Sequence, residues 1–433
     1  MILRARVVVT MDGEPIENGA VAVRGSRISH VGRFADVTRH AAGTPLDLGE
    51  VALLPGLINA HCHLDYTLMR GAIAPTNFFA DWIEAINLAK ASLTSTDYLA
   101  AIAAGFDQAQ RYGTTAIANF EAFPDLLASI AGSPLRVWWF PEMIDIRTPV
   151  NVADIVDRAC EYLSRAGPRS GLGLAPHSLY TASPALFAQA AEIARRDGLL
   201  LSTHLAESRD ETAMFRSASG PLFEMMRRFE RGLDDCGRAT PLARFLQQVR
   251  VGKDWIIAHL NELSSGDFEL LARSQKFHIV HCPRSHRYFS HTPFAIQRLR
   301  ELGFNVCLGT DSLASNESLS LFAEMRALSE KEPALSAREI LEMATVNGAA
   351  ALSKQAELGR VRAGFAADMI AVGSEYTDSE VYDELINFSA EVKWMMIEGE
   401  SVEPQNQEDS RFCFPSLNSE IFSALRLWRK SSL

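Results

Sequence analysis

The sequence predicts an α/β protein: a (β/α)8 barrel with a small β-sandwich formed by its N- and C-terminal segments. Three observations carry this prediction. Short apolar runs alternate with amphipathic segments in the middle of the chain, strand-like segments occupy both ends, and ionisable residues follow several apolar runs. Alternating strands and helices are typical of parallel sheets covered by helices. An open, doubly wound sheet is the alternative that the pattern alone leaves.

The barrel strands are predicted from eight apolar runs. Each run is short and nearly continuous, as expected for a strand that is buried on both faces. The runs are Val51–Leu57, Thr115–Ala118, Val137–Phe140, Leu172–Ala175, Leu199–Ser202, Trp255–Ala258, Phe277–Val280 and Val306–Leu308. Eight is the number of strands that closes a barrel of this class.

The segments between the runs carry helix signals. In Tyr98–Tyr112, apolar residues recur at spacings of three and four, which places them on one face of a helix. Ser183 followed by Pro184 is a typical helix start. Ser336 and Glu339 have the spacing of a capping box. Helices are therefore expected between the strands.

The two ends of the chain are predicted to form the sandwich. The β-branched run Leu3–Thr10 lies near the start, and the strand-like segments Met369–Val372 and Val392–Ile397 lie near the other end. We divide the chain into a sandwich domain (1–51 plus 356–402), a barrel domain (52–355) and a C-terminal tail with one helix (403–433).

Composition and charge narrow the function classes. The 433 residues have a formal net charge of −11, which argues against binding to nucleic acid or to an anionic membrane. The start lacks the apolar core of a signal peptide, and no apolar run approaches the ~18 residues of a membrane span. We expect a cytoplasmic protein whose six cysteines, none in CxxC spacing, are reduced.

The sharpest candidate for a functional site is His61-Cys62-His63, which follows an apolar run. Alternate side chains of a strand point to the same side, so the two imidazoles can face one cavity. Such a pair suits a borderline metal such as zinc. Taken alone, the pair is equally well explained as two ordinary histidines at a strand end.

Further ionisable residues follow other runs. Glu207 lies three residues after His204, a spacing that fits a metal ligand with a general acid or base beside it. His177, His259 and Asp311 follow the fourth, sixth and eighth runs. Each alone has a structural explanation, as a core histidine or a helix cap. Together they place ionisable groups at the carboxyl ends of five strands, the face on which barrel enzymes build their sites.

Four residues are weaker candidates for substrate contacts. Arg284 and His286 follow the seventh run, where a solvated loop explains them as well. Asn316 is equally well explained as a helix cap. Trp82 either lines a pocket or packs in the core.

These residues stand in motifs that resemble one family. The chain contains, in this order, LLPGLINAHCHLD, STHLAES, IIAHL, GTDSLASNESLSLFAEMR and ATVNGAAAL followed by LGRVRAGFAADMIAV. The set resembles the amidohydrolase superfamily, and more narrowly its deaminase and chlorohydrolase branch. That branch includes adenosine, S-adenosylhomocysteine, guanine and aminodeoxyfutalosine deaminases and triazine hydrolases. The resemblance covers almost the whole chain up to about residue 403.

The resemblance implies a role for each matching residue. The residues that match the metal ligands of the family are His61, His63, His204 and Asp311. Glu207 matches the acid/base of the HxxE motif, His259 matches the histidine near the attacking water, and His177 matches a substrate contact. Members with two metals carry a bridging lysine near the end of strand four. Because LGLAPHS has no lysine, we expect one divalent ion, zinc before iron or manganese.

The implied activity is metal-dependent deamination. A metal-bound hydroxide attacks an amidine-like ring carbon of an amino-purine nucleoside or related N-heterocycle. Asp311 and His259 take the proton of the water, Glu207 protonates the ring nitrogen, and ammonia leaves. One alternative is hydrolysis of a C–Cl, C–S or cyclic amide bond by the same residues. A non-catalytic scaffold is a second alternative, against which the complete ligand set argues.

One segment departs from the family pattern. Many relatives carry Asn-Pro-x-Ser-Asn where this chain has His281–His286. An arginine and a histidine there predict a changed substrate, such as a nucleoside that bears an acid group. The expected partner is this small molecule, and a homodimer or larger homo-oligomer is common among similar proteins.

Overall fold

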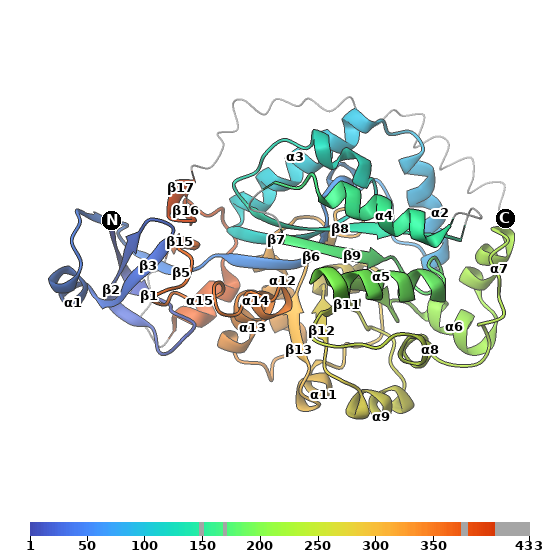
Figure 1. The fold of residues 1–433 in the computed structure, drawn as a ribbon. Helices are drawn as coiled ribbons and strands as arrows, with labels where there is room; N and C mark the ends of the chain where they lie inside the picture. Colours follow the sequence, from blue (N-terminus) through green and yellow to red (C-terminus); the bar gives the residue numbers. More distant parts are fainter. Residues whose placement is uncertain (147–150, 168–170, 374–379, 403–433) are drawn as a thin grey trace.

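The structure is a computed structural model that describes residues 1–146, 151–167, 171–373 and 380–402. The helix predicted within 403–433 lies outside the described residues. Two sheets organise the described chain: a large one surrounded by helices and a smaller one beside it, at the left of Figure 1. Across the described ranges, no helix combines the length and apolar character needed to cross a bilayer.

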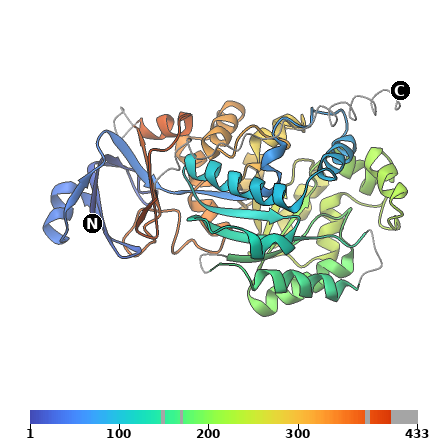
Figure 2. The same cartoon turned by 90° about the horizontal axis from the view of Figure 1, so that it is seen from above.

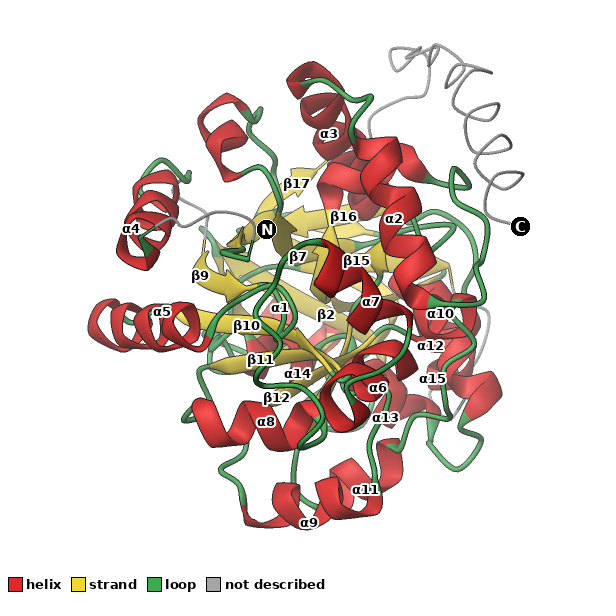
Figure 3. Cartoon of the chain, turned by 90° about the vertical axis from the view of Figure 1, so that its right-hand side faces the viewer, coloured by secondary structure: helices red, strands yellow, loops and turns green. Residues whose placement is uncertain are grey.

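The large sheet is parallel throughout and has nine strands, in the order β13-β12-β11-β10-β9-β8-β7-β6-β14. Their bounds are β6 (Leu57–His63), β7 (Thr114–Glu121), β8 (Arg136–Met143), β9 (Gly171–Pro176), β10 (Leu200–Leu205), β11 (Trp255–His259), β12 (His278–His281), β13 (Asn305–Leu308) and β14 (Asp311–Ser312). The sheet curls, and the helices lie outside the curl (Figure 3). The chain therefore has the α/β architecture of a barrel-like protein.

Both faces of the large sheet are buried, which explains the continuous apolar runs. Phe120 and Phe140 stack on one face, with ring centroids 5.1 Å apart. On the opposite face, Trp139 packs edge-on against Phe106 of a covering helix, at 6.2 Å between centroids. Neighbouring residues such as Trp139 and Phe140 must face opposite sides of a strand, so both sides have to be apolar.

The predicted closed barrel is wrong in one respect, because the ladder of strands does not close. The eighth apolar run, Val306–Leu308, lies in β13, which pairs with β12, whereas β14 begins three residues later and pairs with β6. Between them, the Gly309 N–H donates to the His281 carbonyl and the Thr310 N–H to the His61 carbonyl, each at 3.0 Å. A side chain at Gly309 would lie 2.7 Å from the His61 carbonyl oxygen. The chain changes partner strands at this glycine, which replaces a continuous eighth strand.

The second sheet joins the strands of the N-terminal segment (blue) to those of the segment 369–402 (red-brown), which lie side by side at the left of Figure 2. Its order is β17-β16-β15-β5-β1-β2-β3, and β4 also pairs with β1. The bounds are β1 (Ile2–Val8), β2 (Ile16–Arg24), β3 (Arg27–Arg33), β4 (Pro45–Asp47), β5 (Val51–Pro55), β15 (Met369–Gly373), β16 (Trp394–Ile397) and β17 (Glu400–Val402). The structure thus has one eight-stranded sheet where two packed sheets of a sandwich were predicted, because β5 and β15 pair directly and continue one ladder.

The first predicted strand also needs correction. The run Val51–Leu57 does not form a single strand, since β5 belongs to the small sheet and β6 to the large one. Gly56 separates them, and a side chain there would lie 2.2 Å from Thr115. Gly56 thus lies closely against the Thr115 side chain of β7, at the passage from one sheet to the other.

Helices connect most strands of the large sheet. Their bounds are α1 (Phe34–His40), α2 (Phe79–Lys90), α3 (Ser95–Arg111), α4 (Val152–Leu163), α5 (Pro184–Asp197), α6 (Arg209–Ser217), α7 (Pro221–Arg228), α8 (Pro241–Gln248), α9 (Ser265–Arg273), α10 (Pro283–Tyr288), α11 (Ile296–Glu301), α12 (Leu321–Lys331), α13 (Ala337–Met343), α14 (Val346–Ala351) and α15 (Val381–Asn387), with the 3-10 helices η1 (Leu64–Met69) and η2 (Pro124–Ser129). The predicted caps are confirmed: the Ser183 hydroxyl accepts the Leu186 N–H, and Ser336 and Glu339 form a capping box.

Candidate active site

The predicted ionisable residues meet at the carboxyl ends of the large-sheet strands. His61 and His63 end β6, His204 lies in β10, His259 ends β11 and Asp311 begins β14. Three of them, His63, His204 and Asp311, line a cavity of about 860 Å³, whose lining also includes Trp82, His177 and Glu207. Parallel strands bring their carboxyl ends to the same edge, which explains why residues 250 positions apart in the chain form one cluster.

Three histidines form the centre of the cluster. The ligand nitrogens of His61, His63 and His204 all lie within 4.8 Å of one another. The Nε2 atoms of His63 and His204 are 3.3 Å apart. Nδ1 of His204 lies 2.9 Å from the His177 carbonyl, to which it donates. This hydrogen bond leaves Nε2 of His204 with a lone pair directed at the other rings.

Asp311 supplies a carboxylate to the same centre. Its Oδ1 lies 3.8 Å from Nε2 of His63 and 3.9 Å from Nε2 of His61. Its Oδ2 accepts a hydrogen bond from the Ser285 hydroxyl at 2.6 Å. Burial alone would raise the pKa of Asp311, but its interactions with the nearby His259 and His63 rings and the Ser285 hydrogen bond hold it below its ordinary value. The side chain is therefore held as a carboxylate facing the histidines.

Glu207 and His259 form a second pair beside the centre. Oε1 of Glu207 lies 3.6 Å from Nε2 of His259. Burial raises the pKa of Glu207 well above its ordinary value, and the charge of Asp311 adds to this. Burial also lowers the pKa of His259 to about 3. Burial thus favours the protonated form of Glu207 and the neutral form of His259, in which the two groups are a proton donor and a proton acceptor.

The backbone at the site is held in a rare conformation. His259 and Asp311 have φ angles of 78° and 57°, in the left-handed region that side chains other than glycine seldom adopt. The Glu207 N–H donates to Glu211, at 2.8 Å, and the Asn261 side chain donates to the Glu207 carbonyl, at 3.1 Å. Strain of this kind persists where neighbouring contacts fix the chain, and it is common at active sites.

The donor set fits a metal ion. Both ring nitrogens of His61 and Nδ1 of His63 are buried with no hydrogen-bond partner among the described residues. Burial, followed by the charges of neighbouring histidines, lowers the pKa of both rings, so both are neutral ligands. Buried nitrogens without partners cost free energy, and a cation among them offsets this cost. Three imidazole nitrogens and a carboxylate oxygen are donors that zinc takes.

Comparison with known proteins identifies the family. The sequence pattern of the Amidohydrolase family matches residues 52–402. The chain belongs to this family. The resemblance drawn from the motifs is thereby confirmed, and the protein is a hydrolase of the amidohydrolase class.

Two curated relatives carry deaminase names. A 5-methylthioadenosine/S-adenosylhomocysteine deaminase of Nitratidesulfovibrio vulgaris is 33% identical over 391 residues, covering 86% of this chain and 83% of the relative. A 5'-deoxyadenosine deaminase of Methanosarcina mazei is 32% identical over 390 residues, covering 86% and 84%. The similarity extends over most of both chains.

Solved structures of similar fold agree with the family assignment. An adenosine deaminase from Xanthomonas campestris with bound zinc has a TM-score of 0.78 at 23% identity, covering 99% of this chain and 98% of that one. The aminofutalosine deaminase of Helicobacter pylori has a TM-score of 0.79 at 21% identity, covering 93% and 99%. At these identities the likeness shows the amidohydrolase fold.

The substrate-side candidates of this amidohydrolase separate into two groups. His177 and Trp82 line the cavity. Arg284, His286 and Asn316 are not among its lining residues. These three side chains, two on helix α10 and one after β14, have partners within the protein.

Hydrogen bonds and an ion pair within the protein fix where those three side chains point. Arg284 pairs with Glu317 at 2.7 Å and donates to the Ser318 hydroxyl at 2.8 Å. Nε2 of His286 lies 2.9 Å from the Thr292 carbonyl, which accepts its hydrogen. The Asn316 side chain donates to the Thr310 carbonyl at 2.7 Å and so braces the residue that precedes Asp311. Asn316 thus holds the backbone that leads into Asp311.

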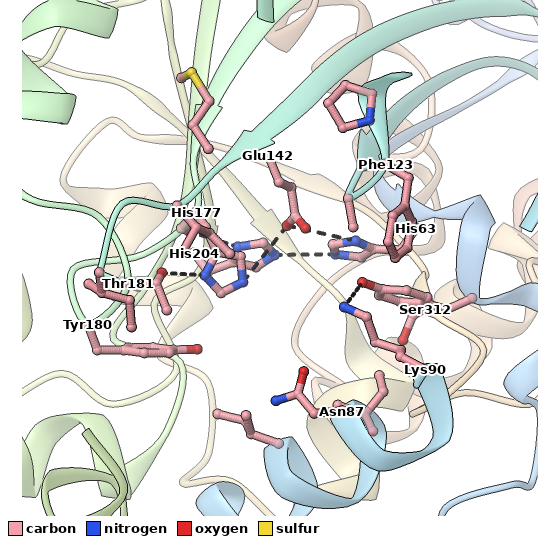
Figure 4. A pocket seen from close by; sticks show the side chains of 18 of the residues that line it. His63, Asn87, Lys90, Phe123, Glu142, His177, Tyr180, Thr181, His204 and Ser312 are labelled. Atoms are coloured by element: carbon pink, nitrogen blue, oxygen red, sulfur yellow. Dashed lines mark hydrogen bonds and ion pairs between the residues drawn. The ribbon is translucent and has the colours of Figure 1, made fainter. Parts of the chain in front are cut away.

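Sequence reasoning missed Glu142, which lines the cavity near the end of β8 (Figure 4). Its Oε1 lies 3.8 Å from Nε2 of His177 and 4.0 Å from Nδ1 of His63. Burial raises the pKa of Glu142 to about 7. The signal was available, because the same strand-end position that singled out His177 and His259 applies to the glutamate of WWFPEM.

Proposed function

We propose that this amidohydrolase is a metal-dependent aminohydrolase that removes the amino group of an amino-purine nucleoside or a related N-heterocycle as ammonia. The observation that carries the proposal is one arrangement. A metal-ligand set of three histidines and Asp311 lies beside the proton donor Glu207 and the acceptor His259, at the side of one cavity. The deaminase names of the relatives that are 32–33% identical support the same class of reaction.

We assign one divalent ion, zinc before iron or manganese, to His61, His63, His204 and Asp311. One ion is the number that His204 allows, since its Nδ1 is committed to the His177 carbonyl and only Nε2 is left for a metal. When bound, such an ion supplies Lewis-acid activation that lowers the pKa of a coordinated water from ~15.7 toward ~7. The donor geometry, with buried and neutral imidazoles, matches this role.

The protein side chains move the protons of the reaction. His259 and Asp311 accept the proton of the attacking water, as a neutral imidazole and a carboxylate placed next to each other. The buried carboxyl group of Glu207 gives its proton to the ring nitrogen adjacent to the attacked carbon. Negative charge on that nitrogen is thereby neutralised as the carbon becomes tetrahedral. The proton held by His259 and Asp311 passes to the amino group, which leaves as ammonia when the carbon–nitrogen bond breaks. The remaining hydroxyl group gives its proton back to Glu207 as the carbonyl forms.

The two sheets have separate tasks in this proposal. The segment 52–355 carries all assigned site residues and forms the catalytic domain. The terminal segments 1–51 and 356–402 form a supporting domain. The small sheet holds both ends of the catalytic segment through the pairing of β5 with β15, close to the passage at Gly56.

A deamination screen with metal analysis tests the proposal. Purified protein is offered adenosine, 5'-deoxyadenosine, methylthioadenosine, S-adenosylhomocysteine, aminodeoxyfutalosine, guanine, cytosine and triazines, and ammonia is measured. We expect ammonia from at least one adenine nucleoside and about one metal ion per chain by elemental analysis. Release of chloride or thiol without ammonia contradicts the deaminase assignment. Protein purified without chelator that contains no transition metal contradicts the metal assignment.

A further inference from the structure

One buried carboxylate of the cavity has no task in the reaction described above. The side chain of Glu142 is 6% exposed, and its Oε1 has no hydrogen-bond partner among the described residues. It lies near the carboxyl end of β8 and lines the cavity between His63 and His177 (Figure 4). A buried carboxylate oxygen without a donor costs free energy, so this position favours a ligand that supplies one.

The spacing around Glu142 leaves room for a ligand atom. The distances of 3.8 Å to His177 and 4.0 Å to His63 are too long for hydrogen bonds. Glu142, His177 and His204 lie close enough together to suggest a second metal ion. His204 argues against this ion, because its Nδ1 donates to the His177 carbonyl and its Nε2 faces His63, 3.3 Å away. We therefore infer that a group of the substrate occupies the space beside Glu142.

Lys90 and Arg158 are cations that line the cavity, and the charge of Lys90 acts on Glu142 by lowering its pKa, against the effect of burial. The Lys90 ammonium group donates to the Tyr66 hydroxyl at 2.7 Å and lies over the Tyr66 ring at 4.8 Å. Arg158 is exposed on α4. Arg284, the residue that the sequence offered for an acidic substrate, pairs with Glu317. At a pH at which Glu142 is ionised, a substrate carboxylate placed on this wall would face a like charge at close range, which is unfavourable.

We propose that Glu142 selects substrates that carry a hydrogen-bond donor, O–H or N–H, beside the reacting ring, and that it disfavours substrates with a carboxylate there. This inference rests on the proposed deaminase function and specifies its substrate class. It replaces the acid-bearing nucleoside suggested by the loop after β12. The carboxylate accepts a hydrogen bond from the donor group, and the neighbouring His177 lies on the other side of the same space.

Matched adenosine derivatives test the selection. The 5' series consists of adenosine, 5'-deoxyadenosine, 5'-amino-5'-deoxyadenosine and adenosine 5'-carboxylate, and 2',3'-dideoxyadenosine removes the other two hydroxyl groups. Binding is measured by calorimetry, and ammonia release is followed in parallel. The variants are Glu142→Gln and, as a matched control, Asp154→Asn. Asp154 lines the same cavity but is exposed, so the control removes an equal charge from the cavity without touching the buried position.

Wild-type protein is expected to bind a donor-bearing derivative at least about 10-fold more tightly than the carboxylate, the size of a hydrogen bond to a charged group. In Glu142→Gln the ratio of the two dissociation constants should fall to within about 3-fold, while Asp154→Asn should keep the wild-type ratio. The metal content of Glu142→Gln should equal that of wild type, because a glutamate that only supported His63 would affect the metal instead.

Three results overturn the inference. These are tighter binding of the carboxylate by wild type, an unchanged ratio in Glu142→Gln, and loss of metal in that variant. Should Glu142→Gln fail to fold, the preference of wild type among the derivatives still decides. Binding and ammonia release separate the two claims: selective binding that depends on Glu142 without ammonia supports the inference and contradicts the deaminase function. Failure of every derivative to bind contradicts the inference itself.

Discussion

Strand β8 carries a charged residue near each of its ends, and the two are treated differently. At its start, Arg136 donates to Asp368 at 2.6 and 3.2 Å and pairs with Glu398 at 2.8 Å. Near its other end, Glu142 has a carboxylate oxygen without a partner. The first group joins the large sheet to the small one, and the second lines the cavity. Both lie largely inside the protein.

The difference between the two groups shows that the presence or absence of a partner separates buried charges that stabilise the fold from those that bind a ligand. At the junction between the sheets, each charge has a hydrogen-bonded partner, so its burial cost is offset within the folded chain. At the cavity, Glu142, His61 and His63 keep atoms without partners. Their burial costs stability that only a ligand or metal recovers. Changes at the junction should therefore affect stability, and changes at the site should affect function.

The largest expected effect is on activity, in Glu207→Gln. The amide cannot give a proton to the ring nitrogen, so kcat should fall by about 10²–10⁴. The midpoint of thermal unfolding should stay unchanged or rise, because a buried carboxyl whose pKa is raised by burial is replaced by a neutral group of the same shape. Steady-state kinetics and a thermal melt on the same preparation check both parts.

The exposed Glu224→Gln on α7 is the control for this variant and should match wild type in both measurements. The metal content of Glu207→Gln should equal that of wild type, since Glu207 is not an assigned ligand. Turnover near the wild-type value would remove Glu207 from the reaction.

At the junction between the two sheets, Asp368→Asn is expected to lower stability and to leave activity unchanged. Arg136 would lose its two-pronged partner but keep Glu398, so the free energy of unfolding should fall by about 2–3 kcal/mol, less than the ~3–5 kcal/mol for a fully buried charge left alone. Activity per folded molecule should be retained. Urea unfolding followed by tryptophan fluorescence measures the free energy of unfolding, and kinetics in the absence of urea measure the activity.

Asp47→Asn provides the comparison within the small sheet. Asp47 pairs with Arg4 at 3.0 Å, but its side chain is 55% exposed, so less than about 1 kcal/mol should be lost. Equal losses in the Asp47 and Asp368 variants would mean that the buried junction contributes no more than a surface ion pair.

More of the candidate site than of the detailed fold could be predicted from the sequence. The alternation of side chains in β6 and the positions of His204, Glu207 and Asp311 at strand ends are local properties, and the family motifs add their roles. The split of the eighth strand at Gly309 depends on how closely two backbones approach in space, which spacing along the chain does not encode.

Loop contacts were the other limit of prediction. Arg284 reads as a substrate ligand from its residue type, but its direction is set by Glu317 and Ser318, partners that lie more than 30 positions away. Glu142 obeys the same strand-end rule as the histidines. It was overlooked because a lone glutamate in an aromatic strand belongs to none of the motifs, and only its missing partner in the folded chain reveals it.

The smallest expected effect concerns a glutamate that resembles the junction more than the site. Glu339 accepts hydrogen bonds from Arg300 and from the backbone and hydroxyl of Ser336, and these lower its pKa to about 2. Its folded pKa lies below the value of about 4.5 for an unfolded glutamate, so its stabilisation is present above that pH and is lost as pH falls toward 2. Because the side chain is 36% exposed, we expect about 0.5 kcal/mol at neutral pH.

Glu339→Gln should therefore be slightly less stable than wild type at pH 7, and the difference should shrink steadily between pH 5 and pH 2. Urea unfolding at several pH values measures it, with the exposed Glu301→Gln as the control. Glu207 shows the opposite direction, since burial without a donor raises its pKa. A stability difference between Glu339→Gln and wild type that stayed constant with pH would mean that the Glu339 carboxylate gains nothing from its partners. The contrast drawn between glutamates with and without partners would then not hold for Glu339.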